Sequence, residues 1–396
     1  MRDRLGVDYD VVVIGAGTVG ALTLWNLSKV PGLSVLGIEQ YGRAHGEGSY
    51  AGESRLFRLA YKEGPLYVPL LVESRRRWLE LQEEAGAEMF LPVGALSVGP
   101  ADRAEMQATR ETINSFGLAH RLLDTADLRR DYPQHAVGAG DVGILDLAGG
   151  GIRPEVAVFN ALRLAEERGV QMRYRCPVLA VEPDENGVTI RTTGGDVRAA
   201  RVVVSAGSWA SELLGAPTDL LSVQRLVLSW FMPRDIDRYA PQRFPVFMRD
   251  VGDVHFFGAP SLDGYSVKVS PGHAALPSAP TVADLPSGID QRTRALLGAQ
   301  VREFFPDMNP EPVRMSDHHD TFTADRVPVV DLDASGRVVV ITGLSGHGFK
   351  LAPAFGRMAR DLVVDGSSSW WREEFGIAAH RRRAQERATA AHVGVA

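Results

Sequence analysis

The sequence contains almost no cysteine, since Cys176 is the only one in 396 residues. This excludes an internal disulfide and a metal cluster held by cysteines. Long apolar runs are also missing, because no uninterrupted hydrophobic stretch approaches the length of a membrane span. The first apolar run ends at Gly15, which argues against a signal peptide. We therefore expect a cytoplasmic protein without a membrane partner.

An excess of positive charge is missing as well. The chain has 43 Lys and Arg against 49 Asp and Glu, for a net charge of -6. Such a balance disfavours a nucleic-acid partner. The hydrophobic content of 45% is ordinary for a globular protein, and 396 residues are enough for two domains. Composition thus favours an enzyme with a small-molecule substrate.

The first motif is a glycine turn that follows a short apolar run at 11–14. Gly15 would permit the tight turn, Gly17 would let a pyrophosphate approach the backbone, and Gly20 would let a helix pack on the strand. A helix N-terminus at this point favours an anion. Glu39 ends a second apolar run, where it would accept hydrogen bonds from ribose hydroxyls and disfavour NADP. The pattern predicts a dinucleotide site.

The rest of the chain indicates an α/β fold in which dinucleotide-binding pieces alternate with another domain. A second glycine-rich turn at 343–350 follows a strand expected at 337–342, and we expect the helix after it at 353–365. Segments at 222–232, 244–249, 254–258 and 264–270 alternate in the manner of an antiparallel sheet. The tail after 373 is expected to be a solvated or docking helix.

Three segments resemble a known family. Residues 49–58 and 202–209 resemble the glycine oxidase/D-amino-acid oxidase superfamily of flavoproteins, and 343–350 resembles its monomeric sarcosine oxidase/N-methyltryptophan oxidase branch. The resemblance runs from about residue 8 to 366. It implies FAD, and an oxidoreductase that oxidises the C–N bond of an amino acid or secondary amine while O2 becomes hydrogen peroxide.

The resemblance also implies the architecture. A Rossmann-type FAD-binding domain at 1–89, 151–219 and 325–396 would be interrupted by a substrate-binding domain at 90–150 and 220–324. The second domain would have a mainly antiparallel sheet and flanking helices, and a monomer is favoured. The residues that would contact FAD are Gly15, Gly17, Thr18, Val19, Gly20, Glu39, Gln40, Ser49, Arg55, Val178, Ala206, Gly207, Trp209, Gly343, Gly346, His347, Gly348, Phe349 and Lys350.

Four cations would form the catalytic centre. By resemblance, Arg58 and Lys350 would hold the substrate carboxylate, for which the planar fork of arginine is suited. Arg55 would lie against the flavin, and Lys268 would activate O2 by stabilising the new negative charge. Two alternatives stay open. The arginines could form surface salt bridges, and Lys268 could lie on the solvent face of an edge strand.

The chain departs from the branch at the flavin linkage. The branch usually tethers FAD through a cysteine at the position of His318, so a cysteinyl linkage there is excluded. A histidyl linkage at His318 is possible, but non-covalent FAD is favoured. A metal site from His318, His319 and Asp320 is disfavoured, because three adjacent side chains of an extended segment cannot all face one ion.

The residues of the substrate pocket also differ from those of the branch. Tyr50 and Ala51 stand where the family carries histidines, and His273 is displaced by one residue from the other pocket histidine. Two pocket tyrosines correspond to Phe257 and Asp320, and Asp320 would either put a carboxylate in the pocket or turn outward. The other functions considered are a flavin dehydrogenase with another electron acceptor and a non-catalytic flavin-binding protein.

Overall fold

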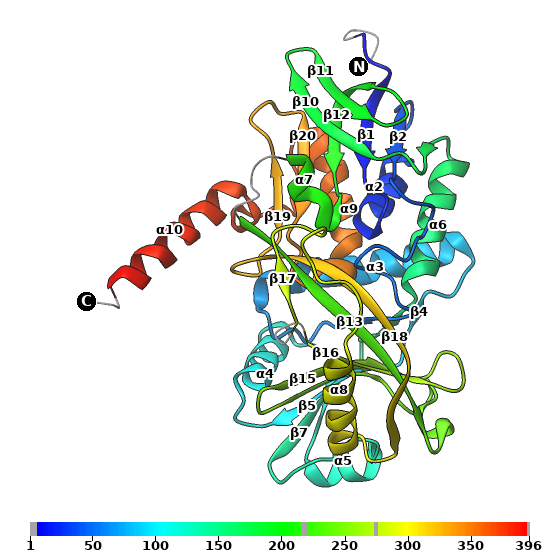
Figure 1. Cartoon of the computed structure of the whole chain (residues 1–396), viewed down its shortest axis with the longest axis vertical. Helices are drawn as coiled ribbons and strands as arrows, with labels where there is room; N and C mark the ends of the chain where they lie inside the picture. The colour runs from blue at the N-terminus through cyan, green and yellow to red at the C-terminus, as the bar shows by residue number, and fades with distance from the viewer. Residues whose placement is uncertain (1–5, 215–219, 273–275, 394–396) are drawn as a thin grey trace.

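Two large β-sheets lie at opposite ends of the longest axis of the molecule (Figure 1). This computed structural model describes residues 6–214, 220–272 and 276–393. The predicted α/β class with a second, mainly antiparallel sheet is confirmed. Among the described residues, no helix combines the length and apolar character needed to cross a membrane.

The upper sheet in Figure 1 has a parallel centre. β1 (Tyr9–Ile14) lies between β2 (Val35–Ile38) and β12 (Val197–Val204) and is parallel to both. The second half of β12 also pairs in parallel with β20 (Val338–Thr342). The carboxyl ends of these four strands therefore reach the same edge of the sheet, which is where ligands bind in open α/β sheets.

The remaining strands extend this sheet. The first half of β12 is antiparallel to β11 (Gly187–Thr192), and β19 is antiparallel to β20. The other members are β9 (Gln171–Arg173), β10 (Val178–Asp184) and β19 (Val329–Leu332).

Side chains alternate across this sheet as the strand period requires. Val11 and Val13 of β1 share a buried core with four helices, whereas Val12 and Ile14 join a second core on the other face. The two largest side chains of the helical core, Trp25 and Trp78, are fully buried. The four helices are α2 (Thr18–Leu27), α3 (Val68–Ala85), α6 (Pro154–Glu167) and α9 (Gly348–Asp365).

α9 begins earlier than the sequence predicts. The sequence predicts a helix at 353–365, but the helix begins at Gly348, includes Lys350 and has Pro353 inside its first turns. The ring of Phe349 stacks on Trp78 of α3, with centroids 5.2 Å apart. This packing holds the first turn of α9, which contains Lys350, against α3.

The lower sheet has nine strands and is mainly antiparallel. β13 (Leu221–Pro233) pairs along its length with β18 (Met308–Thr323), a strand of which the sequence analysis recognised only a short extended segment. On its other side β13 is followed by β16 (Val267–Pro271), β15 (Val254–Ala259) and β14 (Val246–Val251). The sheet is completed by β5 (Ala95–Pro100), β6 (His120–Leu123), β7 (Asp141–Asp146) and β17 (Ser278–Ala279).

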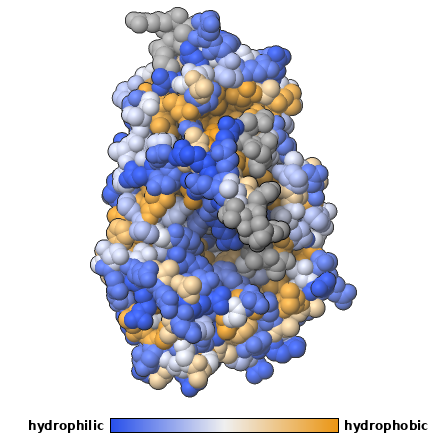
Figure 2. Space-filling model, turned by 90° about the vertical axis from the view of Figure 1, so that its left-hand side faces the viewer, coloured by the Kyte–Doolittle hydropathy of each residue, from blue (hydrophilic) through white to orange (hydrophobic). Residues whose placement is uncertain are grey.

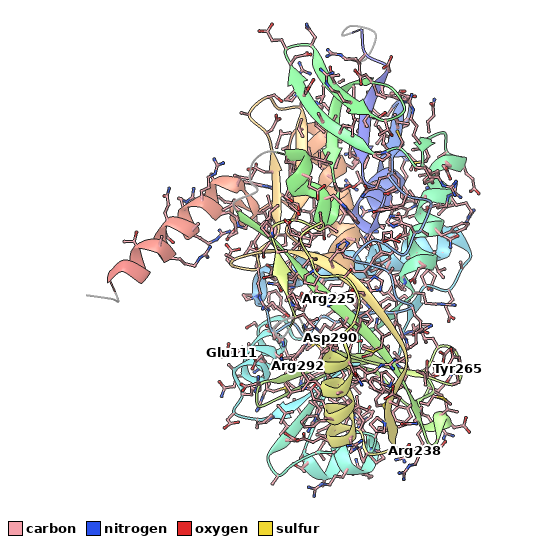
Figure 3. All side chains as sticks on the ribbon, in the orientation of Figure 1. Glu111, Arg225, Arg238, Tyr265, Asp290 and Arg292 are labelled. Carbon is pink, nitrogen blue, oxygen red and sulfur yellow. The ribbon has the colours of Figure 1, made fainter. Side chains whose placement is uncertain are left out.

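Helices flank this second sheet: α4 (Ala104–Phe116), α5 (Thr125–Asp131) and α8 (Gln291–Phe304). Figure 3 shows Arg225 of β13 close to Asp290 at the start of α8. The Arg225 guanidinium donates to Asp317 on β18, at 2.6 Å, and to the carbonyl of Gly288. The strand thereby holds the segment that leads into α8.

A small third sheet contributes to the connection of the two regions. β8 (Gly150–Ile152) pairs with β3 (Arg55–Phe57) on one side and β4 (Phe90–Leu91) on the other. The glycines are needed because a Cβ at Gly150 would lie 2.1 Å from the carbonyl oxygen of Leu91. β3 carries Arg55 toward the region between the large sheets.

The chain passes more than once between the two ends. Strands of the upper sheet come from 9–38, 171–204 and 329–342, and strands of the lower sheet from 95–146 and 221–323. On this basis we propose the division into 1–89, 151–219 and 325–396 and into 90–150 and 220–324.

α10 (Ile377–Val393) projects from the body (Figure 1). The Arg383 guanidinium near its beginning donates to Asp325, at 2.5 Å. Figure 2 shows the side from which this helix projects, and hydrophilic residues predominate there with apolar patches between them.

Candidate active site

A cavity of about 960 Å³ extends from the carboxyl ends of the parallel strands to the lower sheet. Its lining includes Ile14 of β1 and Ile38 of β2, and Met248 and Phe257 from β14 and β15. This volume is at the upper end of the range for ligand pockets, about 300–1,000 Å³. The cavity is therefore large enough for an extended cofactor together with a small substrate.

The three glycines of the first turn have different tasks. Gly15 has φ +84°, and a Cβ there would lie 2.6 Å from the carbonyl oxygen of Ser205. A Cβ at Gly20 would lie 1.8 Å from the carbonyl oxygen of Gly15. At Gly17, which lines the cavity, the nearest atom would be the Tyr50 ring at 3.8 Å. The fold itself thus requires Gly15 and Gly20, whereas Gly17 leaves room for a ligand.

Glu39 is held at the end of β2 by backbone N–H groups. Its carboxylate accepts hydrogen bonds from the N–H of Ala16 and of Tyr41, each at 2.8 Å. Burial raises the pKa of Glu39, but the contact with His45 and these hydrogen bonds outweigh it, so the pKa lies below its usual value. The side chain lines the cavity as an ionised acceptor, which suits ribose hydroxyls.

Arg55, the first residue of β3, lines the cavity. Its guanidinium donates to the carbonyls of Ser49, at 2.8 Å, of Ser54, at 2.9 Å, and of Ala51. Burial lowers the pKa of Arg55 to about 10, which leaves the side chain charged at neutral pH. The cation is thus held on backbone carbonyls, and a buried positive charge lines the cavity.

Lys268 is fully buried on β16, between β13 and β15. This rules out the alternative of a solvent-facing lysine on an edge strand. The ammonium group donates to the carbonyls of Gly52, at 3.1 Å, and Ser54, at 2.7 Å. Burial, with repulsion from Arg55, lowers the pKa of Lys268 well below its usual value. Lys268 does not itself line the cavity, but contacts the segment that leads to Arg55.

Arg58 lines the cavity and keeps two buried guanidinium nitrogens without a hydrogen-bond partner among the described residues. One guanidinium nitrogen, Nη2, donates to both carboxylate oxygens of Glu63, at 2.9 and 3.2 Å. The other two nitrogens, Nε and Nη1, are buried without a hydrogen-bond partner among the described residues. Buried polar groups are normally satisfied, so two vacant donors of a buried cation make Arg58 a candidate for binding an anionic group.

Lys350 lies near Arg58, at the beginning of α9. Its ammonium group donates to the carbonyl of Gly346, at 3.0 Å, and lies 5.5 Å from the centre of the Tyr61 ring. Burial, with repulsion from Arg58, lowers the pKa of Lys350 to about 8. The Arg58 guanidinium lies 4.8 Å from the centre of the same ring. The two cations thus share one aromatic neighbour.

His347 and two tyrosines support these cations. The Tyr61 hydroxyl forms a hydrogen bond with Nδ1 of His347, and Tyr67 stacks on the imidazole with ring centroids 5.3 Å apart. Burial lowers the pKa of His347 to about 3, so the imidazole is neutral at pH 7. The sequence analysis assigned His347 to the cofactor and did not single out Tyr61, Tyr67 or Glu63.

The altered pocket residues also lie at the cavity. Asp320 of β18 turns toward the second glycine turn, where its carboxylate accepts from the N–H of Gly346 at 2.9 Å. Phe257 and the buried Tyr50 line the cavity as well. His273 lies outside the described residues.

His318 is buried but does not line the cavity. Its Nε2 lies 2.9 Å from the hydroxyl of Ser316, and its Nδ1 has no hydrogen-bond partner among the described residues. Burial, with repulsion from Arg55 and Lys268, lowers the pKa of His318 to about 4. His319 faces elsewhere, since its ring packs edge-on against Trp209. In the described part of the chain, no group of three or more His, Cys, Asp or Glu could hold a metal ion.

Most residues that the resemblance assigned to FAD line this one cavity, together with Arg58, Phe257, Asp320 and Lys350 of the substrate set. Gly20 is absent from the lining because it serves the helix–strand contact. The sequence analysis missed Lys62, Asp250 and His255, which also line the cavity. A signal was present for two of them, since Asp250 and His255 are polar residues on either side of a short hairpin turn.

The residues fit a flavin dinucleotide. The first glycine turn, the ionised Glu39 and the second glycine turn line one continuous cavity, which Arg58 also lines beside Lys350. The family model described as FAD dependent oxidoreductase matches residues 10–362.

Two curated relatives match most of the chain. A monomeric sarcosine oxidase of Streptomyces avermitilis is 30% identical over 370 residues, which is 91% of this chain and 95% of the relative. An N-methyl-L-tryptophan oxidase of Yersinia pestis is 30% identical over 390 residues, which is 95% of this chain and 100% of the relative.

Solved structures share the fold. NikD, an amino acid oxidase of nikkomycin biosynthesis, has a TM-score of 0.83 at 24% identity, with 93% of this chain and 97% of that chain covered. The L-proline dehydrogenase of P. horikoshii has a TM-score of 0.80 at 20% identity, with 93% and 96% covered.

Proposed function

The chain belongs to the family of FAD-dependent oxidoreductases, and we propose that it oxidises the C–N bond of an amino acid or secondary amine that carries a carboxylate. FAD, when bound, supplies the two-electron acceptor for this chemistry, and O2 as the final acceptor becomes hydrogen peroxide. The observation that carries the proposal is the buried guanidinium of Arg58, with two vacant donors, in a cavity that the dinucleotide-binding motif also lines.

The substrate carboxylate would bind the guanidinium group of Arg58 and the ammonium group of Lys350, both of which line the cavity. Charge-assisted hydrogen bonds of this kind are about twice as strong as neutral ones, and the arginine fork orients the carboxylate. Glu63 holds the third guanidinium nitrogen, which keeps the fork from rotating. A substrate anchored in this way has a fixed orientation in the cavity, as hydride transfer requires.

Loss of hydride from the neutral amine gives an iminium ion, which water hydrolyses. If the amine binds in its neutral form, no side-chain base has to remove a proton before the transfer. His347 is unsuited to act as a base at neutral pH because its pKa is about 3 and its Nδ1 is engaged with Tyr61. These residues therefore position the cations and do not take part in the proton transfer.

Lys268 would act on the oxygen half of the reaction. Its ammonium group and the guanidinium of Arg55 place two positive charges on the carbonyls of the segment 49–54. A fixed cation stabilises the negative charge that O2 acquires with its first electron. The buried position of Lys268 supports this role, because an ammonium group that, among the described residues, pairs only with backbone carbonyls is costly to bury without a function.

We further propose that FAD is bound without a covalent link and that the protein is a monomer. His318 supports a non-covalent cofactor because its side chain does not line the cavity. Acid precipitation of the purified protein should release the yellow colour into the supernatant. Colour that stays with the precipitate would indicate a histidyl link.

The function is tested by adding secondary amino acids to the purified protein without oxygen. We expect N-methyl amino acids to bleach the flavin absorbance, and admission of air to restore it with release of hydrogen peroxide. Bleaching without peroxide would indicate a dehydrogenase that uses another acceptor. Absence of bleaching by every amine and amino acid tested would contradict the proposal.

A further inference from the structure

The part of the cavity lined by the lower sheet contains a pair of polar side chains, Asp250 and His255. They lie directly opposite each other in the ladder of β14 and β15, and Nδ1 of His255 is 2.6 Å from a carboxylate oxygen of Asp250. Burial raises the pKa of Asp250, but His255 and Lys62 bring it down to about 2, so the carboxylate is ionised and can only accept. Nδ1 therefore carries the proton, and the pair fixes the imidazole orientation.

The other ring nitrogen of His255 is left for a ligand. Asp250 is almost fully buried, whereas the His255 side chain is 33% exposed and lines the cavity. No hydrogen bond from the described residues reaches Nε2 of His255. The chain also makes space for the ring, because a Cβ at Gly272 would lie 2.8 Å from Cδ2 of His255. Gly272 has no left-handed φ, so space and not backbone conformation accounts for the glycine.

The same face of this hairpin contains an apolar pair next to the polar one. Met248 lies opposite Phe257, and both line the cavity. Because side chains on one face recur every second residue, the two pairs are about 7 Å apart along the strands. The Phe257 ring centre lies 6.0 Å from the Lys268 ammonium, so the apolar pair is on the side of the proposed oxygen site. The cavity wall thus changes from apolar at Met248 and Phe257 to polar at Asp250 and His255.

We propose that His255, held by Asp250, binds a hydroxyl or a comparable hydrogen-bonding group on the substrate side chain, beyond an apolar spacer that packs on Met248 and Phe257. This rests on the proposed function and specifies its substrate class. A hydroxyl fits because it both donates and accepts, and so pairs with Nε2 whether or not this nitrogen carries a proton. Lys62, with its ammonium 3.4 Å from the Asp250 carboxylate, supports the pair from the other side.

The test uses the holoenzyme with pairs of N-methyl amino acids that differ by a hydroxyl against a methyl group. The pairs are N-methylserine and N-methyl-2-aminobutyrate, N-methylhomoserine and N-methylnorvaline, and N-methyl-5-hydroxynorvaline and N-methylnorleucine. We expect kcat/KM to favour the hydroxyl member by about tenfold or more at one of the longer chain lengths. In His255→Phe this ratio should fall to about one or below, with the methyl member still oxidised.

Two further variants separate recognition from structure. His255→Gln keeps a group that donates and accepts, and should restore part of the preference. Asp250→Asn should raise KM for the hydroxyl member more than for the methyl member, since Asp250 positions the imidazole. His120→Phe makes the same replacement outside the cavity and should leave the ratio as it is. Visible absorbance shows that each variant retains FAD.

The outcomes are distinct. Equal rates for the two members of every pair in the unmodified enzyme, or a hydroxyl preference that survives His255→Phe, would overturn the role of His255 while amino acid oxidation stands. If no member of any pair bleaches the flavin while another amino acid does, this inference fails and the proposed function stands. If no amine or amino acid bleaches it, both fail.

Discussion

The two ends of the cavity differ in what forms them. At the dinucleotide end, backbone dominates: Gly15, Gly17 and the N–H groups around Glu39 determine its shape. At the substrate end, side chains dominate, with Arg58 and Lys350 from one region and Asp250 and His255 from the other. The cofactor end therefore depends on conformations that few residues can adopt. The substrate end can change by single side-chain replacements, so that shared chemistry acts on different substrates.

The sharpest test of the dinucleotide end compares substitutions of two glycines. Gly20→Ala puts a Cβ 1.8 Å from a carbonyl oxygen, and should lower the free energy of unfolding by about 3 kcal/mol or more and abolish FAD binding. Gly17→Ala meets no protein atom closer than 3.8 Å, so the apoprotein should melt normally while its FAD affinity falls. Thermal melts of the apoproteins and FAD titrations measure both. A normal melt of Gly20→Ala would refute the steric argument.

At the substrate end, the largest effect is expected for Arg58→Met. It removes the vacant donors and leaves Glu63 unpaired in the cavity, so kcat/KM should fall by about 10²–10³, equivalent to about 3–4 kcal/mol. The control Arg75→Met removes an arginine that contacts the carbonyl of Ala148 and does not line the cavity. Steady-state peroxide release compares them. A loss below about threefold in Arg58→Met would mean that the carboxylate binds elsewhere.

Lys268→Met tests whether a buried cation outside the cavity lining belongs to the reaction. Reoxidation of the reduced enzyme by O2 should slow by about 10², the effect typical for removal of one charge-stabilising group. Anaerobic reduction by substrate should change far less. Stopped-flow absorbance measures the two steps separately. Equal slowing of both steps would mean that Lys268 supports only the structure of the segment 52–54.

The smallest effect concerns the pH dependence of carboxylate binding. The pKa of Lys350 is lowered to about 8, so the side chain is charged below this pH and neutral above it. The affinity for butyrate, which has no amine to titrate, should therefore fall by about five- to tenfold between pH 6 and 9. His347 does not titrate in this range, because its pKa is about 3. Flavin difference spectra report the binding, and Lys350→Met should give a flat profile.

The difference between the two ends also explains what the sequence could predict. Gly15, Gly17, Gly20 and Glu39 follow one another in a single strand–turn–helix–strand unit, so local pattern identifies them. Arg58 and Lys350 could be named only by resemblance, since they are almost 300 residues apart and pack around Tyr61. Asp250 and His255 could have been paired from the hairpin alone. That they face the cavity depends on the packing of β14 and β15 against the rest of the fold.

The sequence by itself determined the dinucleotide turn and the α/β class, because these depend on glycine conformations and on short-range periodicity. It indicated the FAD-dependent family by the resemblance of three segments to known flavoproteins. Only the tertiary structure decided that Lys268 is buried, that α9 starts at Gly348, and that Arg58 keeps two vacant donors. Burial and hydrogen-bond partners come from segments far apart in the chain, and local pattern contains no information about which of them meet.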